Sequence, residues 1–465
     1  MEQTNEKPLK LNYKRTFIIG LCFFTILLLW QVYNSQCPIM LNYLLRDYLP
    51  GKSESDYDYI VGIIMALDNL VAIFMIPLTG RLSDKTRTKL GKRMPYIIVG
   101  TILSVITFPF IAISFVLNSL VGVVISMACV LIFMYLYRGP AVSLMPDITP
   151  KPLRSTGNGI INFVGYIGAI CGGALYFVKA FKIPKYDDGN YRNTMVNWQI
   201  ILPFILVSIL MVIALIILVL TIKENKILEE MQSEMKRGEE LATTADKVEE
   251  DAPMTKKNKK DLILILLSVF LWFMAFNSVE TFWSIYCTQT IGVAESQYSI
   301  PTTILVIASL ITFIPGSMLS NKIGRKYTIA IGILCCLVCM VVMCFINQPG
   351  DYLTWKQYVV WVLFVIAGIG WALINVASYP MVVELSPNSK IGKFTGYYYT
   401  ASMLAQTVTP IAIGAIMSFT DFGRKALFPY STILFALALI VFMFITNVKP
   451  KEENNKKGFE ALDND

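Results

Sequence analysis

Two acidic residues interrupt long apolar runs. A charge at such a position raises the free energy of membrane insertion, so its presence suggests a functional role. Asp68 lies near the middle of the run Tyr59–Thr79. A charge at the centre of a membrane-spanning helix costs roughly 2.5–3.5 kcal/mol on insertion scales, so such a residue faces a cavity or a partner by default. The chain contains no histidine, so any group that handles protons is expected to be a carboxylate. We interpret Asp68 as a protonatable coupling residue that also contacts substrate; the alternative is a structural acid bonded to a neighbouring helix.

A polar stripe marks the first apolar run. Gln31, Asn34 and Ser35 follow the spacing i, i+3 and i+4, which places them on one face of a helix. Amides and hydroxyls are neutral partners for vicinal sugar hydroxyls, and Trp30 or Tyr33 offers a face on which a sugar ring can stack. Hydrogen bonds between helices are the alternative role.

A second acid, Glu280, sits in a similar stripe. Asn277, Glu280, Thr281 and Ser284 share one face of the seventh apolar run. We interpret this face as cavity lining, with Glu280 as a second candidate for substrate binding and cation coupling; a structural role is the alternative. Three further side chains are assigned to the same substrate site: Trp371, Asn375 and Gln406.

The elements that must position these residues are long apolar runs. The chain has 465 residues, of which 55% are hydrophobic and 15% charged, and runs of about 18 or more apolar residues indicate transmembrane helices. Twelve spans are predicted: Phe17–Leu41, Tyr59–Thr79, Pro95–Phe115, Leu120–Arg138, Ser155–Val178, Trp198–Ile222, Leu262–Thr290, Ile300–Leu319, Tyr327–Ile346, Trp355–Met381, Lys393–Phe419 and Phe428–Thr446. The predicted organisation is a six-helix bundle over 1–222, a charged linker with a surface helix over 223–260, a second bundle over 261–449 and a tail over 450–465.

The positive charges indicate an orientation rather than a nucleic-acid partner. Of the 40 Lys and Arg residues, 30 fall in segments that share one side of the membrane with both termini and the linker. Because cytoplasmic loops are rich in these residues, that side is expected to be cytoplasmic. The nine cysteines lie in or beside apolar runs, which suggests neither a disulfide framework nor a metal site.

A basic turn between the second and third runs has a degenerate second copy. The segment 80–93 contains six Lys or Arg residues in fourteen positions. Gly80-Arg-Leu-Ser-Asp84 lies 237 residues before Ser317-Met-Leu-Ser-Asn321, and Asp147-Ile-Thr-Pro150 lies the same distance before Glu384-Leu-Ser-Pro387. One shared offset at two places indicates duplicated halves, related by a pseudo-twofold axis along the membrane normal, with a substrate cavity between them.

This loop resembles that of a known family. The pattern Gly-x-x-x-Asp-Lys-Thr-x-x-x-x-Gly-Lys-Arg is similar to the loop between the second and third helices of the major facilitator superfamily. With Met94-Pro95-Tyr96 at its end, it resembles the glycoside–pentoside–hexuronide:cation symporters and the sucrose/maltose–proton symporters. The resemblance implies an all-α membrane protein of twelve helices in two pseudo-symmetric bundles, and a transporter rather than an enzyme.

At two places the sequence departs from the family pattern, so the roles of the family's residues there cannot be assigned directly to this chain. The sucrose carriers have an arginine just after the Gly-Pro of the fourth helix, where this chain has Val142, with Arg138 one helical turn earlier. The paired aspartates of the melibiose carriers correspond to Ala72 and Ile76. A sodium site of that paired type is therefore not expected.

The signature loop and its surroundings are predicted to form a gate at the cytoplasmic side. For Arg138, an inner gate or an ion pair with Asp84 or Asp147 is favoured over a part in coupling. The predicted gating residues are Gly80, Asp84, Arg87, Gly91, Lys92, Arg93, Arg138, Asp147 and Glu384.

These observations predict a secondary transporter in the plasma (inner) membrane with both termini cytoplasmic. No nucleotide-binding signature appears in the sequence, so an ion gradient is expected to drive uptake of a disaccharide or glycoside, without a cofactor or metal, by a monomer. A proton is favoured over sodium because a sodium ion needs several oxygen ligands, whereas a proton needs only the lone carboxylate of Asp68. A drug or metabolite efflux antiporter of the same fold, with a Met- and Phe-lined cavity, is one alternative; a non-transporting sugar receptor is the other.

Overall fold

The computed structural model describes residues 9–52, 55–177, 197–246, 256–292, 298–347, 355–384 and 391–446. Its α-helices are α1 (Tyr13–Tyr48), α2 (Asp58–Lys85), α3 (Met94–Val116), α4 (Leu120–Asp147), α5 (Arg154–Ala174), α6 (Asn197–Thr221), α7 (Glu224–Glu230), α8 (Gln232–Asp246), α9 (Lys256–Ile285), α10 (Ser299–Ile323), α11 (Arg325–Met343), α12 (Lys356–Glu384), α13 (Ile391–Phe419) and α14 (Leu427–Met443). Short 3-10 or π turns extend or join them: η1 (Lys151–Leu153), η2 (Leu175–Phe177), η4 (Tyr286–Ile291) and η7 (Gly423–Ala426).

Twelve helical segments are long and apolar enough to cross a membrane, which confirms the twelve predicted spans. Several helices continue past the predicted ends. Helix α4 was predicted to end at Arg138, but it runs on through Gly139 and Pro140 to Asp147. A Cβ added at Gly139 would lie 2.8 Å from Thr79 Oγ1 of α2. This close contact supports the helix at the point where proline removes a backbone donor.

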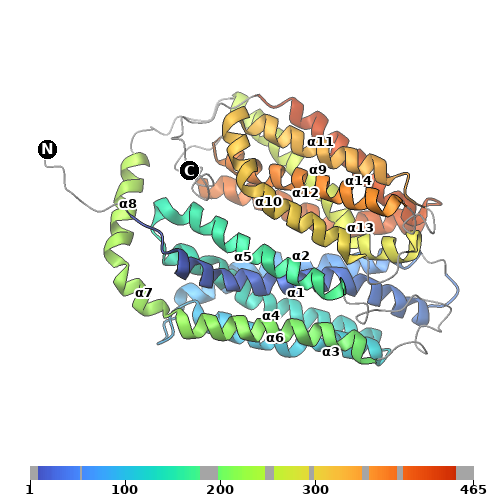
Figure 1. Cartoon of the computed structure of the whole chain (residues 1–465), viewed down its shortest axis with the longest axis horizontal. Helices are drawn as coiled ribbons and strands as arrows, with labels where there is room; N and C mark the ends of the chain where they lie inside the picture. The colour runs from blue at the N-terminus through green and yellow to red at the C-terminus, as the bar shows by residue number, and fades with distance from the viewer. Residues whose placement is uncertain are drawn as a thin grey trace.

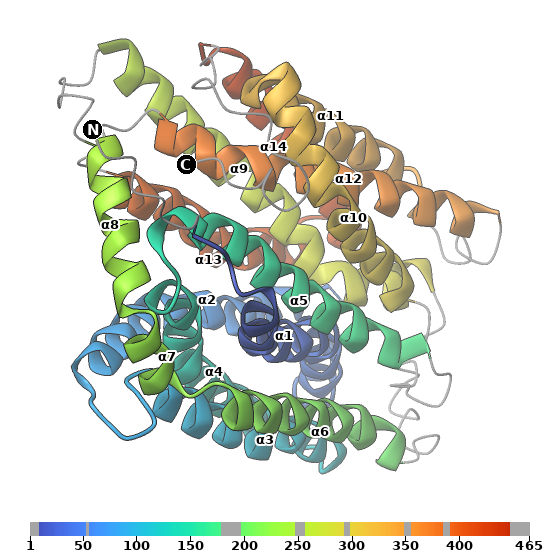
Figure 2. The same ribbon diagram turned by 60° about the vertical axis from the view of Figure 1, so that its left-hand side comes forward.

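The spans form two bundles that lie side by side. Helices α1–α6 make the N half and α9–α14 make the C half, while α7 and α8 lie across one end of the molecule (Figure 1). We call this the linker end and the opposite end the far end. The rotated view shows the two halves side by side, with α2 of the N half near α13 and α5 near α10 of the C half (Figure 2).

The packing of the two halves repeats helix by helix. In the N half, α1 packs on α5, α3 on α4 and α6, and α2 on α4; in the C half, α9 packs on α13, α11 on α12 and α14, and α10 on α12. The interface follows the same symmetry, since α2 packs on α13 and α5 on α10. Gly91 and Gly324 also match, because each has a positive φ (114° and 91°) just before a helix. These correspondences support the duplication predicted from the sequence.

Glycines bring the two halves into backbone contact near the far end. A Cβ added at Gly62 of α2 would lie 2.1 Å from the carbonyl oxygen of Pro410 on α13. One added at Gly414 would lie 2.7 Å from the carbonyl oxygen of Asp58, and one at Gly173 would lie 2.1 Å from Thr303 Oγ1. Real Cβ atoms do not approach so closely, so small residues allow this end of the bundle to close.

The linker is more structured than the sequence predicted. A solvated stretch with one surface helix was expected over 223–260, but the structure has α7 and α8 there, and α9 already begins at Lys256. Residues 247–255 and the predicted tail 450–465 lie outside the described residues. Helix α8 packs on η1, next to the end of α4.

Candidate functional site

A cavity of about 260 Å³ lies between the two halves near the middle of the bundle. Six of the eight residues assigned to the substrate site from the sequence line it: Gln31, Asn34, Asn277, Glu280, Trp371 and Gln406. The structure thus brings together side chains from α1, α9, α12 and α13. These are neutral hydrogen-bonding groups with one carboxylate and one large aromatic ring.

The polar wall joins the two halves at the centre of the cavity. Asn34 Nδ2 of α1 donates to Glu280 Oε1 of α9 over 3.4 Å, and Asn277 lines the cavity about one helical turn before Glu280 on α9. Glu280 is exposed although it lies deep in the molecule, because its side chain faces the cavity. Among the described residues that line the cavity, Glu280 is the only acid. Of the two acids predicted to couple a cation, it is therefore the one that faces the cavity.

An aromatic wall faces the polar one. The rings of Phe276 and Trp371 stack with centroids 3.7 Å apart and planes 6° from parallel, and Phe273 meets Trp371 edge to face. Trp30 also lines the cavity, as the sequence suggested, but Tyr33 is fully buried behind it. The stacking surface available to a ligand is therefore made by α9 and α12 as well as by α1.

Asp68 lies one side chain away from the cavity. It is only 3% exposed, and Tyr135 donates a hydrogen bond of 2.6 Å from its hydroxyl to Asp68 Oδ1. Tyr135 in turn packs edge to face on Trp30 in the cavity wall. Arg138 and Glu280 both act electrostatically on Asp68. Asp68 does not line the cavity, so it can influence a ligand there only through its neighbours.

A wider vestibule of about 670 Å³ continues from the cavity to the linker end. Tyr166, Phe273 and Gln406 line both spaces. The vestibule is bordered by the linker ends of α4, α5, α12 and α13, and Arg138 and Asn375 lie in its wall. Asn375, which was assigned to the substrate site, thus sits on the route to the cavity rather than in the cavity itself.

The far end is closed by a buried polar group that we call the far-end lock, made of Asn42, Arg46, Asp58, Gln289 and Arg424. Arg424 Nε donates to Asp58 Oδ2 over 2.6 Å, and Asn42 Nδ2 donates to Asp58 Oδ1 over 2.9 Å. Arg46 donates to Asn42 and to Gln289. Asn42, Arg46 and Asp58 belong to the N half and the other two to the C half, so the lock ties the halves together.

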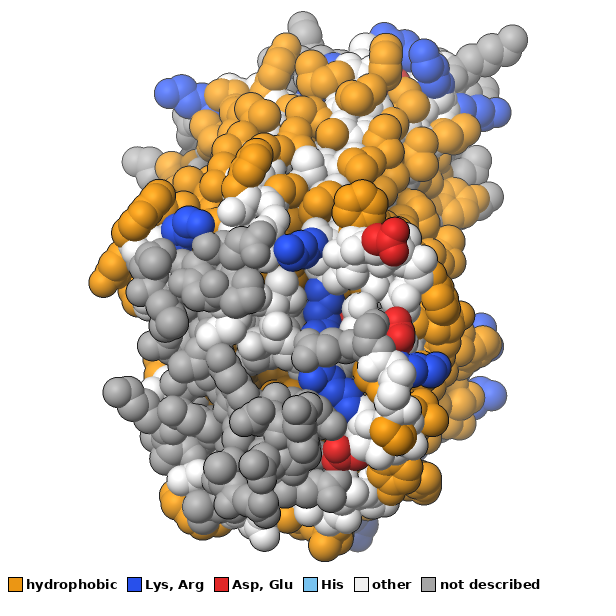
Figure 3. All heavy atoms as spheres, turned by 90° about the vertical axis from the view of Figure 1, so that its right-hand side faces the viewer, with side chains coloured by type: hydrophobic (Ala, Val, Ile, Leu, Met, Phe, Trp, Pro, Cys, Tyr) orange, Lys and Arg blue, Asp and Glu red, His pale blue; other side chains and the backbone are white. Residues whose placement is uncertain are grey.

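The lock lies under a face where charged side chains gather. Seen from the far end, Lys and Arg side chains lie in the middle of the face with Asp and Glu beside them, and hydrophobic side chains cover most of the upper part of the view (Figure 3). Asp58 is 0% and Arg424 6% exposed. Nothing in the sequence pattern linked these five residues, because they come from four separate segments between 42 and 424.

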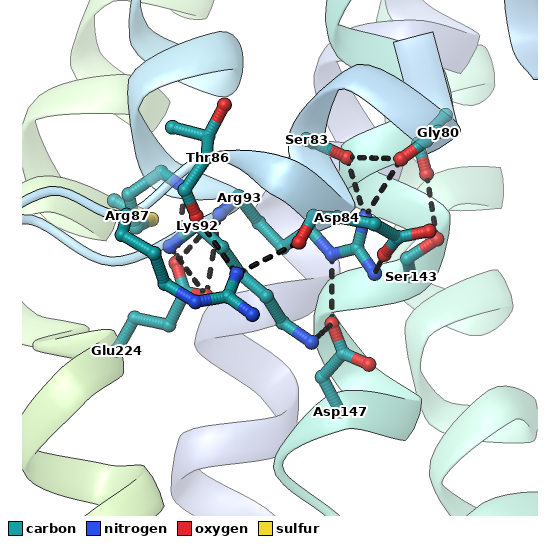
Figure 4. A network of polar contacts seen from close by, with 12 residues as sticks. Gly80, Ser83, Asp84, Thr86, Arg87, Lys92, Arg93, Ser143, Asp147 and Glu224 are labelled. Carbon is teal, nitrogen blue, oxygen red and sulfur yellow. Dashed lines mark hydrogen bonds and ion pairs between the residues drawn. The ribbon is translucent and has the colours of Figure 1, made fainter. Parts of the chain in front are cut away.

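At the linker end, the signature loop forms a second polar group, which we call the loop cluster: Ser83, Asp84, Lys92, Arg93, Asp147 and Glu224. Arg93 donates to Asp147 Oδ2 over 2.7 Å and also pairs with Asp84 and Ser83 (Figure 4). Lys92 Nζ lies 3.0 Å from Asp147 Oδ2. Burial lowers the pKa of Arg93, but Asp147 and Asp84 outweigh this effect and raise the pKa above its usual value.

Glu224 at the start of α7 completes this cluster. Its carboxylate accepts hydrogen bonds of 2.9–3.2 Å from the backbone N–H groups of Lys92, Arg93 and Met94 at the start of α3. These are donors that a helix N-terminus leaves unsatisfied. A Cβ added at Gly91 would lie 2.2 Å from Glu224 Oε2, so this glycine makes room for the carboxylate. Glu224 was not among the gating residues predicted from the sequence.

The remaining predicted gating residues have different environments. An inner gate or an ion pair with Asp84 or Asp147 was favoured for Arg138, but in this structure Arg93 pairs with both carboxylates and Lys92 pairs with Asp147. The guanidinium carbon of Arg138 instead lies 5.7 Å from the ring centroids of Trp30 and Tyr135. Arg87 is exposed and donates only to nearby carbonyl groups. The side chain of Glu384 lies outside the described residues.

Gly80 contributes its backbone to the loop cluster. Its carbonyl oxygen accepts hydrogen bonds from Arg93 Nη1 over 3.3 Å and from Ser83 Oγ over 2.9 Å. A Cβ added at this position would meet nothing within 4 Å. In this conformation, therefore, no close contact requires a glycine at position 80.

Duplicated six-helix halves around a central cavity that opens toward one end define a membrane transporter of the major facilitator type. Comparison with protein families agrees: the model for the family described as "MFS/sugar transport protein" matches residues 22–448. The chain belongs to this family. A comparison with curated protein sequences found no significant match.

Solved structures show the same fold at low sequence identity. A D-xylose–proton symporter is 16% identical, with 93% of this chain and 97% of that chain covered and a TM-score of 0.69. The inward-open xylose transporter XylE from E. coli is 16% identical, with 97% and 98% covered and a TM-score of 0.65. A peptide transporter, POT, in complex with sulfate is 14% identical, with 93% of each chain covered and a TM-score of 0.64. At such identities the likeness concerns the fold alone.

Proposed function

We propose that this protein is a proton-coupled sugar symporter of the plasma membrane, with the linker end and both termini in the cytoplasm. A disaccharide or glycoside would bind in the cavity, and the halves would rock to expose it to either end, with one chain as the transport unit. The family supports the substrate class, and the observation that carries coupling is the pair of intramembrane carboxylates. Glu280 faces the cavity, and Asp68 lies just behind its wall.

The contacts of these two acids supply a route for coupling. A sugar hydroxyl can replace Asn34 as the partner of Glu280 and so alter a hydrogen bond between the halves. Protonation of Asp68 removes the negative charge near Arg138, whose guanidinium lies against Trp30 in the cavity wall. Proton binding at Asp68 would thereby change the surface that a sugar meets.

The surroundings of Asp68 support a proton rather than a metal ion. Hard cations take several oxygen ligands at once, whereas within the described part of the chain Asp68 makes one hydrogen bond, to Tyr135. No group of three or more His, Cys, Asp or Glu side chains that could hold a metal occurs in the described part of the chain. A proton needs only the carboxylate itself.

The test is sugar uptake into proteoliposomes under an imposed pH gradient or sodium gradient. We expect the pH gradient to drive accumulation, and we expect Asp68→Asn to retain counterflow exchange while losing uphill accumulation. Asp421→Asn, an exposed change at the far end, is the matched control. Uptake that is indifferent to both gradients would refute symport, and full accumulation by Asp68→Asn would transfer the coupling role to Glu280.

One observation favours efflux of amphipathic compounds as a second candidate. Met340, Met343 and Phe364 line the cavity together with the amides, and a Met- and Phe-lined cavity is what the efflux alternative predicted. If cells that lack the protein become sensitive to drugs while their growth on sugars is unchanged, efflux replaces sugar uptake as the proposed function.

A further inference from the structure

The cavity extends from the space between the halves into the C half alone. We call this extension the C-half pouch; it is lined by Cys339, Met340 and Met343 of α11 and by Leu363, Phe364 and Ala367 of α12. Helix α11 corresponds by the repeat to α3 in the N half. None of the described residues that line the cavity comes from α3, so the two halves differ here.

The pouch can accept only an apolar group. Its six side chains are 1–6% exposed and carry no charge, and the one thiol, that of Cys339, already donates to the backbone carbonyl of Leu363. A hydroxylated sugar ring placed there would leave its hydroxyls unpaired, at a cost of about 1–3 kcal/mol for each group. Methionine side chains are flexible and polarisable, so Met340 and Met343 can fit around rings or chains of different shape.

The neighbouring wall of α9 offers unused hydrogen-bonding atoms. Asn277 Oδ1 and Ser284 Oγ are buried and have no hydrogen-bond partner among the described residues, and the two residues line the cavity on either side of Glu280. Seven residues of helix separate them by about 10 Å. Buried polar atoms of this kind are normally paired, so this wall fits a ligand that carries hydroxyl groups.

We propose that the substrate is a glycoside with an apolar aglycone: the sugar ring lies against Asn277, Glu280 and Ser284, and the aryl or alkyl aglycone enters the C-half pouch. This assignment rests on the proposed function. It explains why amides and methionines occur in one cavity. A fully hydroxylated sugar would make no use of the methionines, and a purely apolar compound would make no hydrogen bonds to the amides.

The test compares phenyl and methyl β-glycosides of glucose, galactose and xylose as competitors of counterflow and as quenchers of tryptophan fluorescence. Burial of the phenyl ring should make the phenyl glycoside of the accepted sugar bind at least about ten-fold more tightly than its methyl counterpart. Ala367→Leu fills the pouch and should abolish this difference. Met343→Gln keeps the volume of the side chain but makes it polar, and it should have the same effect. Ala169→Leu adds the same bulk to the N-half wall of the cavity and should not affect the phenyl ligand selectively.

Two kinds of result would overturn the inference, and they can be told apart. If phenyl and methyl glycosides compete equally, or if the pouch variants weaken both alike, the pouch holds no aglycone, although sugar transport stands. If benzyl alcohol or other apolar probes bind and no glycoside does, the proposed sugar function fails together with the aglycone assignment. Thermal unfolding of each purified variant shows whether it retains the fold.

Discussion

Asp58→Asn tests whether the far-end lock holds that end closed. The Asp58 carboxylate is fully buried and accepts from Arg424 Nε at 2.6 Å, Arg424 Nη2 at 3.2 Å and Asn42 Nδ2 at 2.9 Å. The substitution keeps the size of the side chain but leaves the Arg424 charge buried beside a neutral amide. Removing one member of a buried ion pair costs roughly 3–5 kcal/mol.

This cost falls on one conformation. Asp58 and Arg424 belong to different halves, so they separate when the far end opens and water can then solvate both. A penalty of 3–5 kcal/mol on the closed state shifts the equilibrium toward the far-open state by roughly 100- to 5,000-fold. The double variant Asp58→Asn/Arg424→Gln removes both charges and should restore part of the closed population, since losing both members of a buried pair costs less than losing one of them.

Pulsed electron paramagnetic resonance between spin labels at positions 49 and 422 measures the result. Leu49 and Phe422 are exposed at the far end on opposite halves, so labelled cysteines there, in a background without the native cysteines, report the opening. Asp421→Asn is the matched control, because this acid is exposed and only three residues from Arg424. An unchanged distance distribution in Asp58→Asn would refute the lock.

Three further predictions follow from contacts described above. Gly62→Ala should open the far end by the same spin-label measurement, because its Cβ would clash with α13, whereas Gly80→Ala should be nearly neutral because its Cβ meets nothing; equal effects would contradict the packing argument. Glu224→Gln should lower the unfolding free energy by about 1–3 kcal/mol, since a charged acceptor for three backbone donors is lost, and Glu229→Gln, on the exposed side of the same helix, should leave the melting temperature unchanged. Tyr135→Phe removes the donor to Asp68 and should reduce uphill accumulation more than counterflow; loss of both alike would indicate a structural role.

The spans and the central cavity could be predicted because local patterns determine them. Long apolar runs predict helices wherever they occur, and the offset of 237 residues placed the first and seventh spans in equivalent positions. Asn34 and Glu280 therefore could be expected to face each other, and they do. Positive charge similarly indicated the loop cluster, although not which residues pair in it.

The missed features depend on contacts between distant segments. Asp68 and Glu280 look alike in the sequence, yet one lies behind Tyr135 and the other faces the cavity. This difference depends on how α2 and α9 are rotated about their axes. A helix that is hydrophobic on all sides has no distinct apolar face, so its sequence does not determine this rotation. The pair Asp58 and Arg424 joins the start of α2 to η7 across 366 residues, and one sequence carries no signal for such a pairing.

The cap that Glu224 provides also bears on how the protein is made. Helix α3 receives its cap from a residue about 130 positions later, so during synthesis the signature loop stays incomplete until all six spans of the N half and the start of α7 have left the ribosome. The N half therefore has the contacts that complete its loop only when α7 is included, and not at the last apolar residue of the sixth span. A fragment that stops at Ile222 would lack the residue that caps α3. A fragment that continues past Glu230 would contain Glu224 and could cap α3 without the C half.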